Sequence, residues 1–142
     1  MTVEEALQVL KDHGYKYTGK REALIRILAR ENRYLTAKEA LDQMLGDYPD
    51  LSFDTIYRNL ALFHELGIVQ MTEIDGERRY RMRCPIAVHH HHLICLSCGA
   101  TQEIHACPLN AMWGEPDDFV IVDHKFEVYG YCRSCAESAS VR

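Results

Sequence analysis

Two Cys-x-x-Cys pairs constrain this chain more than any other feature of its sequence. The pairs are Cys95 with Cys98 and Cys132 with Cys135, and 33 residues separate them. Each spacing lets one tight turn present two sulfur atoms, and four thiolates in two such pairs suit a tetrahedral zinc ion. Four protein ligands leave no open coordination position, so we expect a structural zinc site. A thioredoxin-type redox motif would account for one pair but not for both.

A run of four histidines, His89 to His92, lies shortly before the first pair. Alternate residues of an extended segment face opposite sides, so His90 and His92 would point one way and His89 and His91 the other. Cys84 adds a soft thiolate, which favours zinc over iron or manganese. We therefore expect a sensor metal site formed by Cys84, His90, His92 and one further ligand. A His-rich loop with incidental metal affinity is the alternative.

The other two histidines of the run predict an additional metal site. His89 and His91 could bind a metal ion together with His124. Three more polar side chains nearby could contribute: Glu103, His105 and Cys107. Cys107 could also be simply a small, half-buried residue.

The composition changes near residue 84, and this change predicts two domains, 1–83 and 84–142. All six cysteines lie at or after Cys84. Residues 1–83 hold 13 Lys and Arg against 14 Asp and Glu, whereas residues 84–142 hold 3 against 7. The net charge of −5 by itself argues against a nucleic-acid partner. Six basic and two acidic residues between Lys16 and Arg33 nevertheless form a local patch that could attract DNA.

The expected location is the cytoplasm. No run of 18 apolar residues occurs, and the N-terminus has no apolar segment of the signal-peptide type. The cytoplasm keeps thiols reduced, so metal binding is a better interpretation of the six cysteines than disulfides are.

The first domain has the helix signals of a small helical unit. A first helix starts near Val3 and ends at Gly14, and three further helices start at the N-cap residues Thr18, Thr36 and Ser52. The last of these helices places three large apolar residues on one face, and an acid, an arginine and an alanine on the opposite face. The first face consists of Ile56, Leu60 and Phe63, and the second of Asp54, Arg58 and Ala61.

A hairpin is expected to follow these helices. Asp75-Gly76 separates two strand-like runs, 68–74 and 77–83. Tyr80 and Met82 should face inward, and three arginines should face outward: Arg79, Arg81 and Arg83. Short helices followed by a hairpin are the element order of a winged helix-turn-helix, in which one helix enters the DNA major groove.

Short strands are expected in the second domain at 93–95, 101–104 and 119–131, with a turn or helix at 108–113. The predicted fold class is therefore α+β. It consists of an N-terminal winged helix-turn-helix DNA-binding domain and a small α/β domain with structural zinc.

The chain resembles the ferric uptake regulator family of metalloregulators over nearly its whole length. Five segments carry the resemblance: Tyr17 to Arg21, Ser52 to Leu60, the run from His89 into Cys95-x-x-Cys98-Gly99, His124, and Tyr129 to Cys135. Within the family, the chain is most similar to the zinc uptake regulators of Gram-positive bacteria, because Cys84 matches their thiolate ligand. These regulators often have an acidic ligand just after the helix that reads DNA, and Gln70 stands at that place here. The fourth sensor ligand could therefore be Glu73, Glu103 or Gln70. Asn110 stands where the additional site usually has an acid.

The resemblance implies that 84–142 is a metal-binding dimerisation domain. It further implies a zinc-loaded homodimer that binds an inverted-repeat operator and represses genes of zinc uptake. Tyr57 and Arg58 would contact bases or phosphate, with Thr55 supporting them. Four residues would position the DNA backbone: Lys16, Tyr17, Lys20 and Arg21.

Three other functions stay open. The first is an iron-, manganese- or peroxide-responsive repressor of the same family. The second is a zinc-ribbon interaction module without DNA binding, which leaves the helix with Tyr57 and Arg58 unexplained. The third is a zinc hydrolase or deaminase, which would need an open zinc position and a carboxylate base. The deaminase signature is absent because Ile94, not proline, precedes Cys95.

Overall fold

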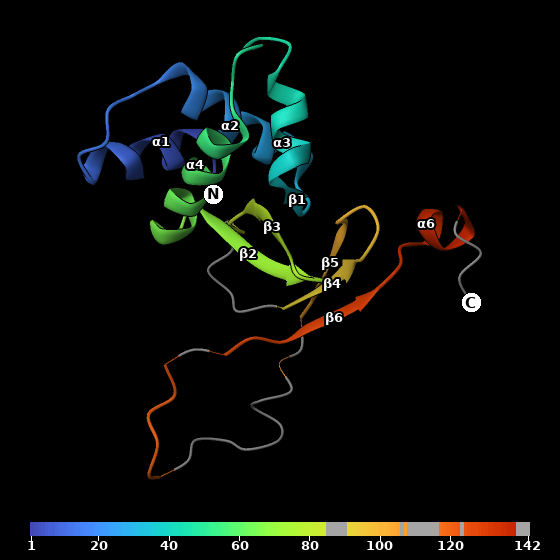
Figure 1. Ribbon diagram of the computed structural model, residues 1–142. Helices are drawn as coiled ribbons and strands as arrows, with labels where there is room; N and C mark the ends of the chain where they lie inside the picture. Colours follow the sequence, from blue (N-terminus) through green and yellow to red (C-terminus); the bar gives the residue numbers. More distant parts are fainter. Residues whose placement is uncertain (85–90, 106, 108–116, 123, 139–142) are drawn as a thin grey trace. The chain divides into compact units, whose positions relative to one another are not determined.

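The computed structural model describes residues 1–84, 91–105, 107, 117–122 and 124–138 (Figure 1). The chain divides into two compact units, Met1–Pro85 and Ile86–Arg142. Cys84 belongs to the first of these units, whereas the sequence-based boundary assigned it to the second. Among the described residues, no helix is long and apolar enough to cross a membrane.

Unit 1 begins with four helices that the sequence predicted. They are α1 (Val3–Asp12), α2 (Gly19–Glu31), α3 (Ala37–Met44) and α4 (Phe53–Glu65). Each begins after a side-chain oxygen that accepts a hydrogen bond from a free backbone N–H group of the first turn, which stabilises the helix end. These N-cap residues are Thr2, Thr18, Thr36 and Ser52.

The three-stranded antiparallel sheet of unit 1 has the order β1-β3-β2. Its strands are β1 (Leu35–Thr36), β2 (Val69–Ile74) and β3 (Glu77–Met82). Asp75 and Gly76 have φ angles of 52° and 80°, the left-handed conformation that a two-residue hairpin turn requires. The predicted hairpin is therefore confirmed, while the short strand β1, which pairs with β3, was not predicted.

The orientation predicted for the hairpin arginines is wrong at Arg81. Tyr80 and Met82 are buried as expected, but Arg81 is also buried, with only 5% of its surface exposed. Successive side chains of a strand alternate between its two faces, so residues 80 and 81 lie on opposite faces. This alternation does not determine whether other residues cover one face or both. Here the second face is covered locally, because the guanidinium packs over Tyr34.

The core of unit 1 fixes how helix α4 is presented. Ile56, Leu60 and Phe63 are each at most 1% exposed. Because they occupy one face of the helix, Arg58 and Asp54 lie on the outer face, where their side chains are 73% and 78% exposed.

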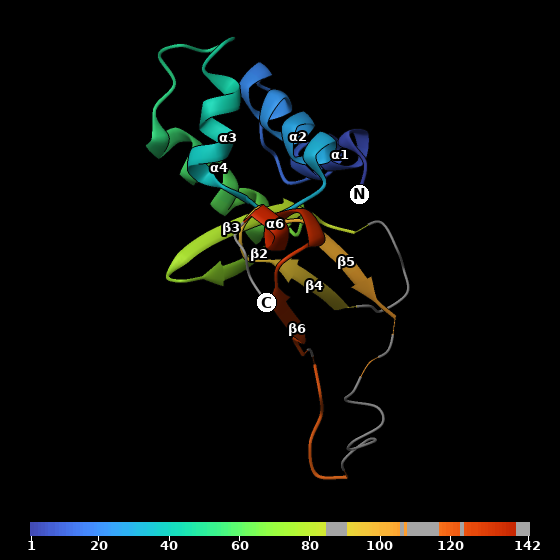
Figure 2. The same ribbon diagram turned by 90° about the vertical axis from the view of Figure 1, so that its right-hand side faces the viewer.

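Unit 2 is built on a three-stranded sheet with the order β5-β4-β6 (Figure 2). Its strands are β4 (His91–Cys95), β5 (Thr101–Ile104) and β6 (Glu127–Gly130). The central strand β4 pairs antiparallel with β5 and parallel with β6. Helix α6 (Arg133–Ser138), which the sequence did not predict, follows β6.

Two of the three strands predicted for unit 2 are confirmed, and the third is shorter than expected. Only Glu127–Gly130 of the predicted segment 119–131 forms a strand. Phe119, Val120 and Val122 stand before it with 70%, 86% and 92% of their surfaces exposed, so within this chain they have little to pack against. The turn or helix predicted at 108–113 lies outside the described residues.

Candidate functional site

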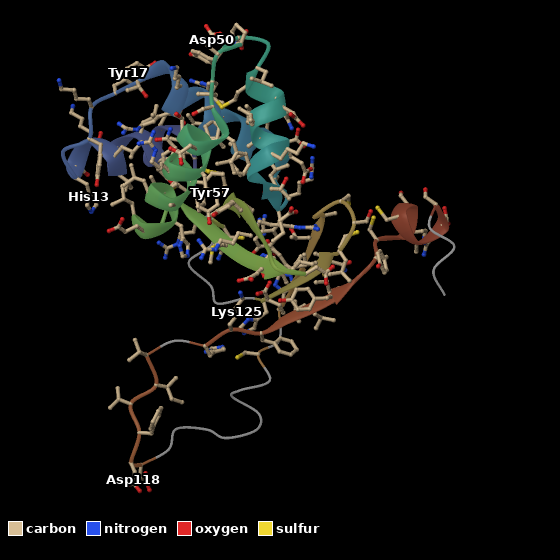
Figure 3. All side chains as sticks on the ribbon, in the orientation of Figure 1. His13, Tyr17, Asp50, Tyr57, Asp118 and Lys125 are labelled. Atoms are coloured by element: carbon tan, nitrogen blue, oxygen red, sulfur yellow. The ribbon has the colours of Figure 1, made fainter. Side chains whose placement is uncertain are left out.

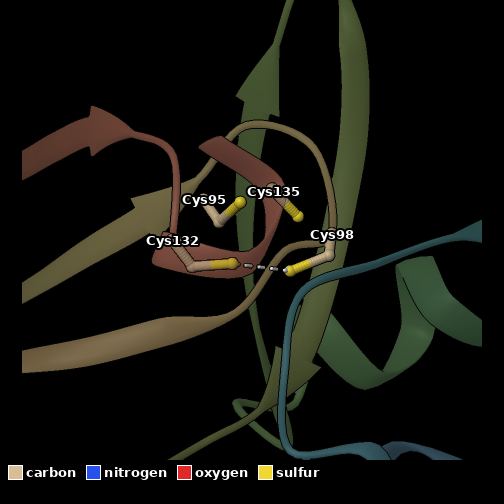
Figure 4. Close-up of side chains that lie close together, drawn as sticks. All are labelled: Cys95, Cys98, Cys132 and Cys135. Carbon is tan, nitrogen blue, oxygen red and sulfur yellow. Dashed lines mark hydrogen bonds between the residues drawn. The ribbon is translucent and has the colours of Figure 1, made fainter. Parts of the chain in front are cut away.

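The four cysteines of the two Cys-x-x-Cys pairs converge at one end of the sheet of unit 2 (Figure 4). All four sulfur atoms lie within 4.8 Å of one another. The Sγ atoms of Cys98 and Cys132 are 3.9 Å apart. A tetrahedral ion with bonds of ~2.3 Å separates its sulfur ligands by ~3.8 Å, whereas a disulfide would need ~2.05 Å. The cluster therefore has the dimensions of a four-thiolate metal site.

Backbone pairing brings the two pairs together despite the 33 residues between them. Cys95 ends β4 and lies opposite Gly130 at the end of β6. The N–H of Leu96 donates to the carbonyl of Gly130 at 2.8 Å, which continues this pairing into the first turn. Gly99, with a φ of 77°, completes the turn in a conformation that residues with a side chain rarely adopt.

The electrostatics of the cluster favour a bound cation. Burial raises the pKa of Cys95, but backbone N–H groups of Cys132, Cys98 and Ser97 outweigh it and lower the pKa to about 6. Burial, with the neighbouring thiols, raises the pKa of Cys98 to about 12. Cys95 thus loses its proton readily, whereas its neighbour Cys98 does not. A bound cation is needed to keep all four thiols deprotonated at once.

A second cluster joins His91, Cys107 and His124. The Nε2 atoms of the two histidines are 3.1 Å apart, and the Cys107 Sγ lies 3.2 Å from Nε2 of His124. Bonds of ~2.0–2.1 Å to a tetrahedral ion would place two ligand nitrogens ~3.3 Å apart. The three atoms therefore converge as metal ligands do, although a hydrogen bond between the imidazoles also fits the N–N distance.

This cluster contains three of the residues that the sequence offered for the additional metal site. His91 and His124 lie together, and Cys107, for which the sequence left a ligand and a small half-buried residue as alternatives, lies beside them. Glu103 is in register with His92 rather than with His91, so it lies on the other face of the sheet. The side chain of His105 is 78% exposed and lies 3.7 Å from the Glu103 carboxylate. His89 lies outside the described residues.

His92 lies between two acidic residues on the face of the sheet opposite His91. In the strand register it pairs with Glu103 of β5 and with Glu127 of β6. His92 is 7% exposed, and the side chain of Glu127 is 8% exposed. The sequence-based reasoning missed Glu127, because the parallel pairing of β4 with β6 gives no signal in local residue spacing.

The residues predicted as sensor ligands, Cys84, His90 and His92, do not all belong to one unit. Cys84 belongs to unit 1, His92 to unit 2, and His90 lies outside the described residues. Within unit 1, the Sγ of Cys84 lies 3.4 Å from Nη1 of Arg81 and 4.0 Å from Oε1 of Gln70. Gln70 is thus near Cys84, while Glu73 lies opposite Arg78 near the hairpin turn.

The residues predicted to read DNA lie on helix α4. Arg58 is on its exposed face, where it forms a surface ion pair of 3.2 Å with Asp54. Tyr57, labelled in Figure 3, accepts a hydrogen bond of 2.7 Å from Arg78 of the hairpin and stacks on Phe53. Thr55 shares a hydrogen bond of 2.9 Å with the N-cap residue Ser52.

The residues predicted to contact the DNA backbone border the same surface. Thr18, Lys20 and Arg21 line one hollow together with Thr55 and Arg58. Lys16, Tyr17 and Lys20 are exposed. The hydroxyl of Tyr17 donates to Glu22, a bond that raises the pKa of Tyr17.

Arg21 has a structural role that the sequence did not predict. Its Nε donates to the side chain of Asn59 at 3.3 Å, and its Nη1 donates to the carbonyl of Lys16 at 2.9 Å. These bonds tie helix α2 to helix α4 and to the preceding loop.

A helix-turn-helix unit that exposes Arg58 beside Lys20 and Arg21, followed by a sheet with two clusters of potential metal ligands, defines a DNA-binding metalloregulator. The profile of the Ferric uptake regulator family matches residues 12–129, and the chain belongs to this family. It is thus a metal-responsive transcriptional regulator and not an enzyme. Members of the family bind operator DNA as dimers with metal ions.

Known relatives match the chain over nearly its full length. The Ferric uptake regulation protein of Staphylococcus epidermidis is 46% identical over 142 residues, which cover 99% of this chain and 100% of the relative. The ferric uptake regulator of Helicobacter pylori superposes with a TM-score of 0.74 at 23% identity, covering 95% and 94% of the two chains. A zinc uptake regulator in complex with zinc and DNA has a TM-score of 0.65 at 22% identity, covering 97% and 95%. The two structures share the α+β fold with this chain.

Proposed function

We propose that this protein is a zinc-responsive repressor that binds an inverted-repeat operator as a zinc-loaded homodimer and controls genes of zinc uptake. The observation that carries the proposal is the thiol of Cys107 beside His91 and His124. Thiolates select zinc, while iron(II) and manganese(II) are bound more often by imidazole, carboxylate and water. Cys84 is a second thiol outside the four-cysteine cluster. The Staphylococcus epidermidis relative is a ferric uptake regulation protein by name, which makes an iron-responsive regulator the second candidate.

Cys84, His90 and His92 are proposed as ligands of the regulatory zinc. The strand register supports Glu103 as the fourth ligand, because it lies opposite His92 on the same face of the sheet. Four side chains of this kind satisfy a zinc ion without an open position. The four-cysteine cluster would hold a separate zinc ion that stays bound when the regulatory site empties.

The proposed DNA contacts follow from the exposed face of α4. Arg58 and Tyr57 would reach bases, supported by Thr55. Four residues before and at the start of α2 would bind phosphates: Lys16, Tyr17, Lys20 and Arg21. The hydrogen bond from Arg78 holds the Tyr57 hydroxyl toward the hairpin. The Tyr57 ring, which stacks on Phe53 and lies 6.0 Å from Cζ of Arg78, would meet an apolar surface such as a thymine methyl group.

The exposed apolar residues of unit 2 support a homodimer. Phe119, Val120 and Val122 would be covered by a second copy of the chain, since contiguous exposed apolar groups commonly mark interfaces. A dimer presents two α4 helices to two half-sites, which doubles the contacts available to one small helix.

Regulation would then be a shift between two arrangements of the protein. A divalent cation supplies the bonds that hold the regulatory ligands together. Zinc must shift the populations of the two arrangements from 1:99 to 99:1 in favour of the DNA-competent one. For this, the zinc ion must bind the DNA-competent arrangement roughly 10⁴-fold more tightly than the other, a difference of about 5.5 kcal/mol. Two regulatory sites per dimer could share this difference.

Fluorescence anisotropy of labelled duplexes tests the function directly. An AT-rich inverted repeat and a pool of genomic fragments would be titrated with protein at fixed salt, because affinity depends steeply on ionic strength. Free zinc, iron(II) and manganese(II) would be buffered separately in anaerobic samples. Tight binding that requires zinc supports the proposal. Binding driven by iron or manganese refutes zinc specificity, and the absence of metal-dependent binding to any fragment refutes the function.

Arg58→Ala should weaken operator binding by ~100-fold or more, with folding and zinc content unchanged. A bidentate base contact contributes ~1–3 kcal/mol, and a dimer loses two of them. The side chain is 73% exposed, so truncation should leave the melting temperature within ~2 °C, since surface changes rarely exceed ±0.5 kcal/mol.

Arg26→Ala is the matched control for Arg58→Ala. It removes the same charge and the same kind of helical ion pair, here with Glu22 at 2.9 Å, from an exposed position. It should reduce affinity by less than ~3-fold, as expected for one screened surface charge. Equal effects of the two variants in a salt-matched titration would remove Arg58 from base recognition.

Cys107→Ser should lower the zinc affinity of the second cluster by ~100-fold or more without affecting the four-cysteine zinc. Loss of a residue that only hydrogen-bonds to a ligand already costs about 10–100-fold in metal affinity, and loss of a ligand itself should cost more. His124→Ala should remove the same zinc equivalent. His105→Ala is the control, since this histidine is exposed and outside the cluster. Zinc per chain, measured by competition with a chromogenic chelator, distinguishes these results. Unchanged zinc binding in both ligand variants would show that the cluster is only hydrogen-bonded.

A further inference from the structure

Arg81 is a buried cation in strand β3 that the DNA contacts proposed above do not use. It is 5% exposed, whereas Arg78 and Arg83 of the same hairpin are exposed. Its guanidinium makes contacts in three directions. Nη1 donates to the sulfur of Cys84 at 3.4 Å, Nη2 donates to the side chain of Asn32 at 3.0 Å, and the ring of Tyr34 lies 5.9 Å from its Cζ.

The two hydrogen bonds connect distant parts of the sequence within unit 1. Cys84 follows the end of β3, and Asn32 caps the C-terminus of α2 with a φ of 47°. The planar guanidinium presents its donors in a fixed fork, so the position of the sulfur is tied to the end of this helix. Helix α2 is in turn bonded to α4 through Arg21 and Asn59.

We propose that Arg81 is the positioning residue of the regulatory metal ligand Cys84. It would aim the sulfur through an N–H···S hydrogen bond from the cationic guanidinium, and hydrogen bonds that involve a charged group are stronger than those between neutral groups. Partners of this kind orient metal ligands, and their loss costs about 10–100-fold in metal affinity. Arg81 also gives the metal ligand a hydrogen-bonded connection to α2 and hence to the DNA-reading helix. This inference rests on the proposed role of Cys84.

The inference accounts for the burial of Arg81. An arginine that only contacted phosphate would not need to be buried, and could stay exposed as Arg78 and Arg83 are. A buried guanidinium carries a desolvation cost that its neighbours must offset. The contacts that offset it here include the thiol, the amide and the aromatic ring, and of these the thiol has the chemistry to bind a metal.

The test compares Arg81→Gln, Arg81→Lys and Arg83→Gln in the full-length protein. Arg81→Gln should lower the affinity for the regulatory zinc by 10–100-fold while the four-cysteine zinc stays bound. Arg81→Lys should recover part of the affinity, because it keeps the charge but not the two-directional fork. Arg83→Gln removes an exposed charge next to Cys84 in the sequence, and should leave the affinity within about 2-fold, as expected for a screened charge.

Cobalt(II) substitution gives a readout that a merely structural role would not move. The thiolate-to-cobalt charge-transfer absorption of the regulatory site should shift or weaken in Arg81→Gln and be unchanged in Arg83→Gln. If Arg81→Gln does not fold, the variant Asn32→Gly takes its place in the test. Glycine tolerates the φ of 47°, so this change removes the side-chain amide that accepts from Arg81 and keeps the backbone conformation. It should weaken regulatory zinc binding by about 3–10-fold, less than loss of the whole N–H···S partner.

Cys84→Ser distinguishes failure of the inference from failure of the proposed function. If Cys84→Ser loses the regulatory zinc while Arg81→Gln, or Asn32→Gly in its place, binds zinc and cobalt like the wild type, the inference is overturned and the function stands. If Cys84→Ser itself keeps wild-type zinc binding and cobalt absorption, the proposed sensor site and the inference both fail. Parallel losses in Cys84→Ser and Arg81→Gln, with partial recovery in Arg81→Lys, support the inference.

Discussion

Cys95→Ser should unfold unit 2 and abolish dimerisation. The unit, Ile86–Arg142, is near the lower size limit for a chain that folds on its hydrophobic core alone. Structural zinc sites contribute an apparent ~10–16 kcal/mol at neutral pH, more than the whole stability of most small domains. Cys95 lies in the central strand and is 4% exposed, so its loss removes both a ligand and an anchor between the sheet and the turn. We expect the structural zinc to be lost, together with the metal sites that depend on the folded sheet of unit 2 and the near-ultraviolet dichroism of this unit.

Cys107→Ser is the matched control for Cys95→Ser, because it makes the same atomic change at a cysteine outside the cluster. It should keep the structural zinc and the dimer. Sedimentation velocity and zinc content would be measured on both variants. A Cys95→Ser protein that remains a folded, zinc-responsive dimer would contradict the structural assignment.

Cys84→Ser should leave the fold and the dimer intact but raise the free zinc needed for half-maximal DNA binding by ~100-fold or more. The reason is that a ligand contributes more to metal affinity than the outer partners, whose loss already costs 10–100-fold. At 1.4 kcal/mol per tenfold, the change corresponds to ~2.8 kcal/mol or more of binding free energy. Anisotropy at buffered free zinc measures this directly.

Cys84→Asp extends the test to metal selectivity. Replacing the soft thiolate by a hard carboxylate should lower the preference for zinc over manganese(II) and iron(II) in the same assay. Wild-type zinc dependence in both Cys84 variants would show that this thiol is not a sensor ligand, and the regulatory role would pass to the cluster of His91, Cys107 and His124.

Local chemistry made much of the fold predictable. The helix starts at Thr18, Thr36 and Ser52 were predicted because capping depends on a side chain and the backbone a few residues away. The turn at Asp75-Gly76 was predicted because few residues tolerate positive φ angles. The burial of Arg81 was not, since it depends on contacts with Asn32 and Tyr34, which lie about 50 residues away in the chain.

The sequence alone determined which chemistry the protein can carry. Two Cys-x-x-Cys pairs imply a four-thiolate site because each spacing brings its own two sulfurs together, and the structure shows that the pairs converge. Only the tertiary structure decided which of the remaining ligands share a site. The pairing of β4 with both β5 and β6 places His92 with Glu103 and Glu127, and the chain fold brings Cys107 to His91 and His124. These neighbours depend on strand register and long-range packing, which the spacing of residues along the chain does not encode.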